Sequence, residues 1–140
     1  MAPGERPIVL VVDDDPIVLR STARVLAREY DVEPFESPRA LLARASAGPV
    51  AAVVTDMRMP EMNGFELATA LHALDPALPI VMVSATGAED DAADAVARGV
   101  SACLAKPFGP GELLAAVEAA LTRAASTERR PSSSRSRSAG

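Results

Sequence analysis

Four short apolar runs stand out in this sequence, and each of them ends in a polar side chain. The runs and the residues that follow them are 8–12 before Asp13, Asp14 and Asp15, 50–55 before Asp56, 79–83 before Ser84, and 101–105 before Lys106. Runs of this length are typical of β-strands, and a strand that is apolar almost throughout is buried on both faces. The chain is therefore expected to form a parallel sheet that is covered by helices on both sides.

Segments with helical spacing alternate with these runs, at residues 16–29, 38–45, 64–74, 89–98 and 111–123. A further strand is expected at 31–37, where Pro34 cannot donate to a ladder and so favours an edge position. The alternation predicts an α/β fold with a doubly wound, five-stranded parallel sheet in the order 2-1-3-4-5. Ligands of such sheets bind beyond the carboxyl ends of the strands, at the switch point between strands 1 and 3.

The composition indicates one domain with unequal charge. The chain has 140 residues, of which 49% are hydrophobic, and a net charge of -5. We expect an N-terminal extension at residues 1–7, a single domain at 8–122 and a disordered Ser- and Arg-rich tail at 123–140. Five Arg and one Glu lie in that tail, which leaves 9 basic against 18 acidic residues elsewhere. A domain of this charge is not expected to bind nucleic acid directly.

The sequence shows no sign of a membrane segment. No apolar stretch approaches the roughly 20 residues that are needed to span a bilayer. The N-terminus lacks a basic region followed by an apolar segment, and the single cysteine, Cys103, agrees with a reducing compartment. We therefore expect a cytoplasmic protein that makes no contact with a membrane.

The carboxylates of Asp13, Asp14 and Asp56 are expected to converge at the switch point. Their mutual repulsion raises a pKa unless a cation intervenes, and hard carboxylate oxygens with room for water favour Mg²⁺. A carboxylate can also attack phosphorus and form an aspartyl-phosphate when nearby positive charge neutralises the transferring group. Lys106, the only lysine of the chain, offers a point charge for that group, and Ser84 offers a hydroxyl.

Four stretches of the chain together resemble the receiver domain of response regulators, the phosphoryl-accepting module of two-component signalling. They are Val-Val-Asp-Asp-Asp at 11–15, Thr-Asp-Met-Arg-Met-Pro-Glu-Met-Asn-Gly at 55–64, Ser-Ala-Thr at 84–86 and Lys-Pro-Phe at 106–108, and the resemblance covers residues 8–122. It implies a flavodoxin-like fold, similar to that of chemotaxis regulators. It also implies that a histidine kinase or phosphotransfer protein donates a phosphoryl group, and that a face binding an unidentified output protein then switches. The expected product is a phosphoprotein with slow autodephosphorylation, and the domain is not expected to be an enzyme.

The same resemblance implies a set of metal ligands. Asp56 would be the phosphoacceptor and would also touch Mg²⁺. Asp14 and the backbone carbonyl of Arg58 would bind the ion directly, and Asp13 would bind it through water. Asp15 is interpreted as a solvated carboxylate at a helix start, where acids suit the helix dipole.

Two residues are implied to contact the phosphoryl group, namely Lys106 and Ser84, and the bond from Lys106 to Pro107 would be cis. Ser84 would move toward the group. Cys103 departs from the resemblance, because the family usually has Tyr or Phe there and that ring swings inward when the hydroxyl moves. A cysteine is too small to report the movement in that way, so the switch at Ser84 and Cys103 is expected to be unusual.

Other residues with reactive or adaptable side chains have plainer interpretations. His72, the only histidine, lies on a predicted helix away from the strand ends and is interpreted as a partly exposed helix residue. Met57, Met59 and Met62 could form an adaptable binding loop. Packing in the core and in the loop is the favoured interpretation of these methionines.

Two alternative functions remain open from the sequence. Phosphohydrolases of the haloacid dehalogenase type share the Asp nucleophile, the Mg²⁺ and the Lys, but they need a second acid two residues after the nucleophile, where this chain has Arg58. A receiver-like scaffold that is never phosphorylated would keep the fold alone. The presence of every acceptor residue argues against that scaffold.

Overall fold

The computed structural model describes residues 6–84 and 97–129. Within them, parallel strands form one sheet in the order β2-β1-β3-β4-β5. The strands are β1 (Ile8–Val12), β2 (Asp31–Phe35), β3 (Ala52–Asp56), β4 (Ile80–Ser84) and β5 (Ala102–Ala105). The observed order confirms the predicted 2-1-3-4-5 topology.

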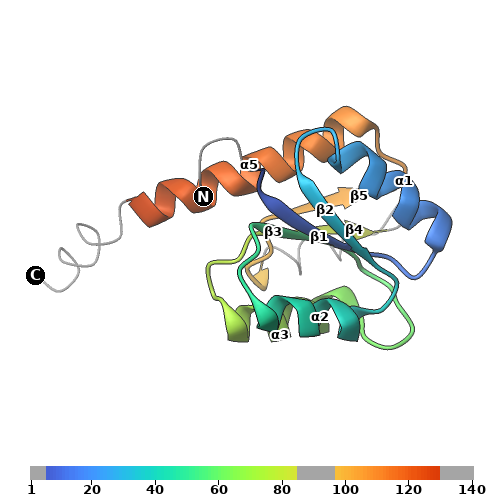
Figure 1. The fold of residues 1–140 in the computed structure, drawn as a ribbon, viewed down its shortest axis with the longest axis horizontal. Helices are drawn as coiled ribbons and strands as arrows, with labels where there is room; N and C mark the ends of the chain where they lie inside the picture. Colours follow the sequence, from blue (N-terminus) through green and yellow to red (C-terminus); the bar gives the residue numbers. More distant parts are fainter. Residues whose placement is uncertain (1–5, 85–96, 130–140) are drawn as a thin grey trace, which may run out of the picture.

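Helices cover both faces of this sheet, as Figure 1 shows. They are α1 (Pro16–Leu26), α2 (Pro38–Ala47), α3 (Gly64–Leu74) and α5 (Pro110–Arg129). The helices α1 and α5 lie on one face and α2 and α3 on the other. Most of the helix predicted at 89–98 lies outside the described residues. Among the helices that are described, none combines the length and the hydropathy that crossing a membrane requires.

Each face of the sheet buries its own set of apolar side chains. Toward α2 and α3 the buried strand residues include Leu10, Val53 and Met82, and toward α1 and α5 they include Val9, Val54 and Val81. Side chains alternate between the faces of a strand, so a strand that feeds both cores must be apolar throughout. Burying one large apolar side chain contributes roughly 1.5–3 kcal/mol, and the continuous runs in the sequence are explained by this double burial.

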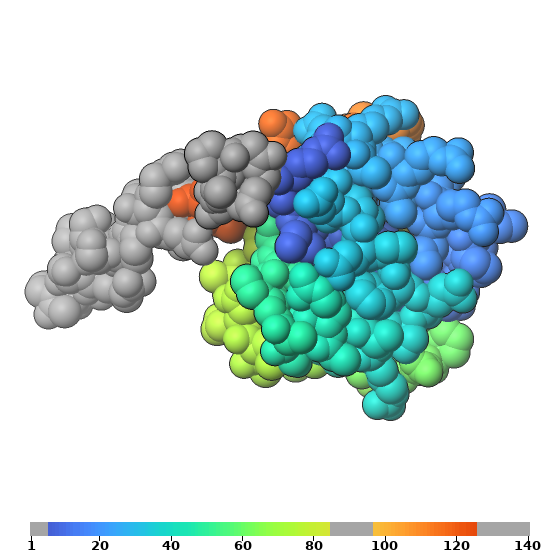
Figure 2. Space-filling model, in the orientation of Figure 1, coloured from blue at the N-terminus to red at the C-terminus, as the bar shows by residue number. Residues whose placement is uncertain are grey.

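The second strand lies at an edge of the sheet, as Pro34 predicted. Pro34 is paired with Val11 of β1 and is itself exposed. Figure 2 shows the same side of the molecule as Figure 1, with residues of α1, β2 and α2 at the surface. Because an edge strand has one free side, the missing N–H of proline costs no ladder hydrogen bond there.

Polar caps start the helices at the carboxyl edge of the sheet. The Asp15 carboxylate accepts from the N–H of Ile17 over 2.9 Å, and Pro16 follows as the first helical residue. Asn63 and Glu66 form a reciprocal capping box at the start of α3. Each such cap contributes about 0.5–2 kcal/mol. The turns that carry the candidate site are thereby fixed to regular elements.

The C-terminal helix is longer than predicted. The sequence analysis ended it at Arg123 and assigned 123–140 to a disordered tail, whereas α5 continues to Arg129. Arg123 is held against the sheet, because its Nη2 donates to the carbonyl oxygen of Ser101 over 2.6 Å. The prediction stopped where the apolar spacing stopped, although alanine, glutamate and arginine continue a helix readily. Residues 130–140 lie outside the described part of the chain.

Candidate functional site

Three strands place charged side chains at one edge of the sheet. Asp13, Asp56 and Lys106 each come two residues after an apolar residue, Val11, Val54 and Leu104, that faces the α1–α5 layer. Because side chains on a strand repeat every two residues, the three charged groups emerge on the same side at the carboxyl end. Their convergence thus follows directly from the strand pattern.

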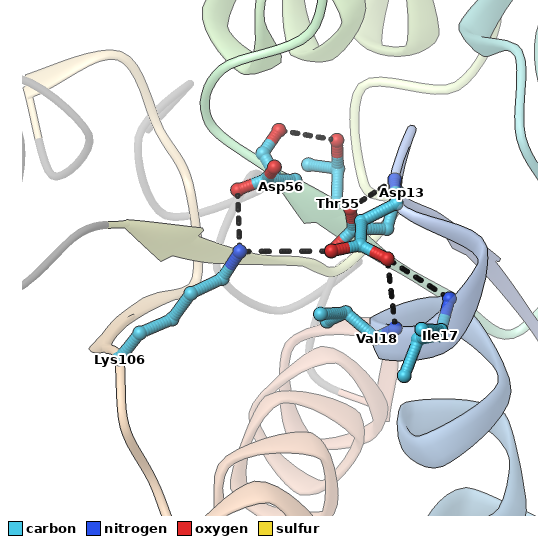
Figure 3. A network of polar contacts seen from close by, with 7 residues as sticks. Asp13, Ile17, Val18, Thr55, Asp56 and Lys106 are labelled. Carbon is cyan, nitrogen blue, oxygen red and sulfur yellow. Dashed lines mark hydrogen bonds and ion pairs between the residues drawn. The ribbon is translucent and has the colours of Figure 1, made fainter.

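Lys106 lies between two of the carboxylates, as Figure 3 shows. Its Nζ is 3.3 Å from Oδ1 of Asp56 and 3.6 Å from Oδ2 of Asp13. Asp14 completes the group, since one carboxylate oxygen from each of Asp13, Asp14 and Asp56 lies within 4.8 Å of the others. The site therefore sets three carboxylates against one ammonium group.

Burial perturbs the pKa of Asp13. Its side chain is only 8% exposed, and this desolvation raises its pKa above the ordinary value of 3.8. The N–H of Asp15, 2.9 Å from Oδ1 of Asp13, opposes the rise. Repulsion from Asp56 adds to the rise and attraction to Lys106 again opposes it. On balance the pKa of Asp13 is raised, and the largest cause is the burial of its carboxyl group.

The donor set suits a small hard cation. All three candidate side-chain ligands are carboxylates, and Asp14 is exposed while Asp13 is buried. Mg²⁺ typically takes one or two protein carboxylates and keeps the remaining positions for water and phosphate oxygens. An acidic cluster with one open side fits that pattern. The carbonyl of Arg58, an exposed residue two positions after Asp56, stays a predicted ligand.

Ser84 ends β4 at the same edge of the sheet as the acidic cluster, but its hydroxyl has a different partner. Its Oγ lies 3.7 Å from Sγ of Cys103, and the residue is only 3% exposed. The backbone N–H of Lys106 donates to the Ser84 carbonyl over 2.8 Å. Within the described part of the chain, the side chain of Ser84 makes no hydrogen bond with Asp56 or Lys106. The sequence analysis did not predict the contact with Cys103. In the parallel register, Met82 lies opposite Cys103. Ser84 comes two residues after Met82, so the side chains of Ser84 and Cys103 lie on one face of the sheet.

Two residues that the sequence analysis passed over hold the backbone of Asp56. The hydroxyl of Thr55 donates to the carbonyl oxygen of Asp56 over 2.9 Å. A methyl group on Gly64 would lie 2.9 Å from that same oxygen, so only glycine fits there without a shift. The signal for Gly64 was its place at the start of the helix predicted at 64–74, which indicated no close approach to the acceptor.

The remaining predictions about single residues can be compared directly with the structure. Asp15 is the N-cap of α1, which confirms its interpretation as a helix-start carboxylate. His72 is half-buried near the end of α3, with Nε2 3.1 Å from the carbonyl oxygen of Leu78, away from the strand ends. Met57 and Met59 are buried in the core on the α2–α3 side. The peptide bond between Lys106 and Pro107 is cis, as predicted.

Comparison with known proteins places this architecture in a family. Residues 9–118 match the sequence family described as the response regulator receiver domain, and the chain belongs to that family. Members are the regulatory phosphoacceptor modules of two-component signalling, which confirms the predicted regulatory class and does not favour the phosphohydrolase alternative.

Named relatives show the same similarity in sequence. The chain is 38% identical over 122 residues to the transcriptional regulatory protein PrrA of Mycobacterium tuberculosis, covering 86% of this chain and 52% of PrrA. It is 32% identical over 120 residues to the transcriptional regulatory protein CreB of Escherichia coli, covering 85% of this chain and 52% of CreB. The chain spans about half the length of these curated relatives.

Solved structures show the same similarity in fold. FixJ-N superposes with a TM-score of 0.78 at 31% identity, covering 84% of this chain and 95% of FixJ-N. A CheY-like receiver domain protein from Methanospirillum hungatei gives a TM-score of 0.80 at 27% identity, covering 87% of this chain and 98% of that one. These similarities confirm the flavodoxin-like fold class.

Proposed function

We propose that this domain takes a phosphoryl group onto Asp56 from a histidine kinase or a phosphotransfer protein, with Mg²⁺ bound at the acidic cluster. The observation that carries the proposal is the position of Lys106 Nζ, 3.3 Å from Asp56 and 3.6 Å from Asp13. An ammonium group at that point meets the oxygens of a phosphoryl group once Asp56 is phosphorylated. The family membership supports the same chemistry.

The transfer is a displacement at phosphorus. An oxygen of the Asp56 carboxylate forms the new P–O bond, and the P–N bond to the donor imidazole breaks, with its electron pair returning to the imidazole nitrogen. Mg²⁺, when bound, supplies positive charge that neutralises the phosphoryl oxygens. Asp13 and Asp14 would hold that ion, together with Asp56 and the carbonyl of Arg58. Lys106 exchanges its contact with the free carboxylate for one with a phosphoryl oxygen, and Ser84 donates its hydroxyl to another.

The consequence of phosphorylation is a change in a face that contacts an output protein. The relatives named above are transcriptional regulatory proteins of which this chain spans about half the length, and we propose that this domain passes its state to such an output by protein contact. The acidic body of the domain argues against direct contact with nucleic acid. We propose a cytoplasmic location, because the proposed donor kinase takes its phosphoryl group from ATP.

Phosphorylation by a small donor tests the proposal. The protein is incubated with acetyl phosphate and Mg²⁺ and its intact mass is followed. We expect the gain of one phosphoryl group by the wild type, no gain by Asp56→Asn, and no gain when EDTA is present. Undiminished labelling of Asp56→Asn would contradict the assignment of the acceptor. Steady release of phosphate from a small phosphoester, without accumulation of labelled protein, would instead support a phosphohydrolase.

A further inference from the structure

The hydroxyl of Ser84 rests against a thiol in a buried position. Ser84 Oγ and Cys103 Sγ are 3.7 Å apart, and Ser84 is 3% exposed. In the described part of the chain, Cys103 is the one side-chain partner of this hydroxyl. A hydrogen bond that involves a thiol is weak, because sulfur is a poor donor and a poor acceptor. The resting partner of Ser84 is therefore one that a better partner can replace.

The sheet register explains why these two groups meet. Strands β4 and β5 run parallel, with Met82 opposite Cys103 and Ser84 opposite Ala105. Met82 and Cys103 both pack into the core on the α2–α3 side, and Ser84 shares the face of Met82 because the two are two residues apart. The Ser84 hydroxyl is thus held toward the α2–α3 side. The carboxylate of Asp56 and the ammonium of Lys106 extend from the other side of the sheet.

A phosphoryl group on Asp56 would compete for this hydroxyl. Phosphoryl oxygens are charged acceptors, and hydrogen bonds to a charged acceptor are about twice as strong as those between neutral groups. Ser84 has a single Oγ on a short side chain and must leave its present rotamer to reach the group. Leaving that rotamer opens the contact with Cys103.

We propose that Cys103 is a positioning residue for the Ser84 hydroxyl, which it holds away from Asp56 in the free protein and releases on phosphorylation. This inference rests on the proposed function, since it requires a phosphoryl group on Asp56. It gives Cys103 a role that does not depend on size. The resemblance implies that an aromatic ring at this position swings inward when the hydroxyl moves, whereas the thiol of Cys103 takes part through the contact that it loses.

The S–H stretching band of Cys103 reports the contact directly. Because Cys103 is the only cysteine in the chain, the protein has one such band in its infrared or Raman spectrum, and the band shifts with the hydrogen bonding of the thiol. We expect Ser84→Ala to shift the band in the free protein. Phosphorylation of the wild type, or addition of beryllofluoride as a phosphoryl mimic, should shift it in the same direction, and Asp56→Asn treated with acetyl phosphate should show no shift.

The outcomes separate this inference from the proposed function. A wild-type protein whose mass increases by one phosphoryl group but whose S–H band stays unchanged would overturn the inference and leave the proposed function intact. An unchanged band in Ser84→Ala would overturn it as well, because the contact would then be absent in solution. Failure to gain a phosphoryl group would overturn the proposed function and, with it, the inference.

Two substitutions at Cys103 test the role by opposite effects. Cys103→Ser keeps the contact and replaces the thiol with a stronger hydrogen-bonding group, so beryllofluoride should bind more weakly. Cys103→Ala removes the contact, so beryllofluoride should bind more tightly. We expect each change to be about two- to threefold, the low end of what one hydrogen bond contributes. Circular dichroism checks that both variants are folded. A shift of both variants in the same direction, or of neither, would indicate simple packing and overturn the inference.

Discussion

The α-carbon of Gly64 faces the carbonyl oxygen of Asp56 so closely that a methyl group on it would lie 2.9 Å from that oxygen. Its other neighbours would be Met57 Cα and Met82 Cε, both at 3.1 Å. Two of these three contacts are with backbone atoms, which cannot turn aside as a flexible side chain does. The start of α3 and the candidate acceptor are thus packed backbone to backbone.

Gly64→Ala should therefore destabilise the domain by roughly 1–3 kcal/mol, the usual cost of overpacking a core. It should also slow the labelling of Asp56 by acetyl phosphate, because the methyl group displaces the backbone that carries the carboxylate. Gly111→Ala is a matched control, since nothing lies within 4 Å of a methyl group at that position of α5. Urea unfolding and intact mass give both readouts. Equal stability of Gly64→Ala and Gly111→Ala would show that the backbone around Gly64 accommodates the methyl group without a loss of folding free energy.

Adjacent acids at the end of β1 should separate metal binding from helix capping. Asp14 belongs to the carboxylate cluster, whereas Asp15 caps α1 through the N–H of Ile17. Asp14→Ala should abolish the increase in Tm that Mg²⁺ gives the wild type through binding to the folded state. Asp15→Ala should lose about 0.5–2 kcal/mol of stability and retain both the response to Mg²⁺ and the labelling. If Asp15→Ala lost the Mg²⁺ response and Asp14→Ala kept it, the metal ligand would be Asp15 and not Asp14.

The raised pKa of Asp13 predicts how stability depends on pH without metal. The folded state holds the proton of Asp13 above the ordinary pKa of 3.8, where the unfolded chain has already released it. The contribution of Asp13 to folding stability is therefore largest below pH 3.8. This contribution is lost as the pH rises through the folded-state pKa. Asp13→Asn removes the titrating group and still offers an oxygen to the N–H of Asp15.

In Mg²⁺-free buffer, Asp13→Asn should accordingly unfold at a higher urea concentration than the wild type at pH 7, and the two should converge toward pH 4. Mg²⁺ should stabilise the wild type more than the variant, since it neutralises the charge that the variant lacks. A variant that is less stable than the wild type at pH 7 without metal would show that the contact between Lys106 and Asp13 outweighs the burial of the carboxylate.

The extension of α5 gives a prediction about where the domain ends. Arg123 donates to the Ser101 carbonyl over 2.6 Å, at a position that the sequence analysis assigned to a tail. Arg123→Ala should cost roughly 1 kcal/mol, typical of one net hydrogen bond, and Arg20→Ala on an exposed part of α1 should change stability less. Shortening the chain to end at residue 122 should lower the Tm more than ending it at residue 129. Thermal unfolding of the four proteins measures these changes. Equal Tm values for the two truncations would show that this boundary is wrong.

The strand pattern was sufficient to predict the sheet and the meeting of Asp13, Asp56 and Lys106. Continuous apolar runs require burial on both faces, parallel strands end at one edge, and period-two alternation determines which side chains emerge together. Pro34 identified the edge strand because a missing donor is tolerated only there.

The contacts that were missed depend on distances between elements rather than on patterns within them. The close approach of Gly64 to Asp56 is set by how α3 packs on β3, which the local sequence does not encode. The contact between Ser84 and Cys103 needed the register of β4 with β5. The interpretation of Cys103 rested on the size of its side chain and overlooked the thiol as a partner for a hydroxyl.

Lys106 provides the last test, because it is the only lysine in the chain. Its Nζ approaches single oxygens of two different carboxylates, Asp56 and Asp13, which is the geometry of a point charge. Arginine would bring a planar fork that prefers both oxygens of one carboxylate. Lys106→Arg should therefore lower the rate of labelling by acetyl phosphate roughly tenfold, equivalent to about 1.4 kcal/mol of lost transition-state interaction. Lys106→Met, which removes the charge but keeps much of the side-chain length, should lower the rate of labelling further.

Wild type enriched with ¹³C at lysine Cε should give one side-chain resonance, and that resonance should move when Asp56 is phosphorylated. Labelling of Lys106→Arg at the wild-type rate, together with an unmoved resonance in the wild type, would show that the ammonium group only balances charge in the free protein and does not contact the phosphoryl group.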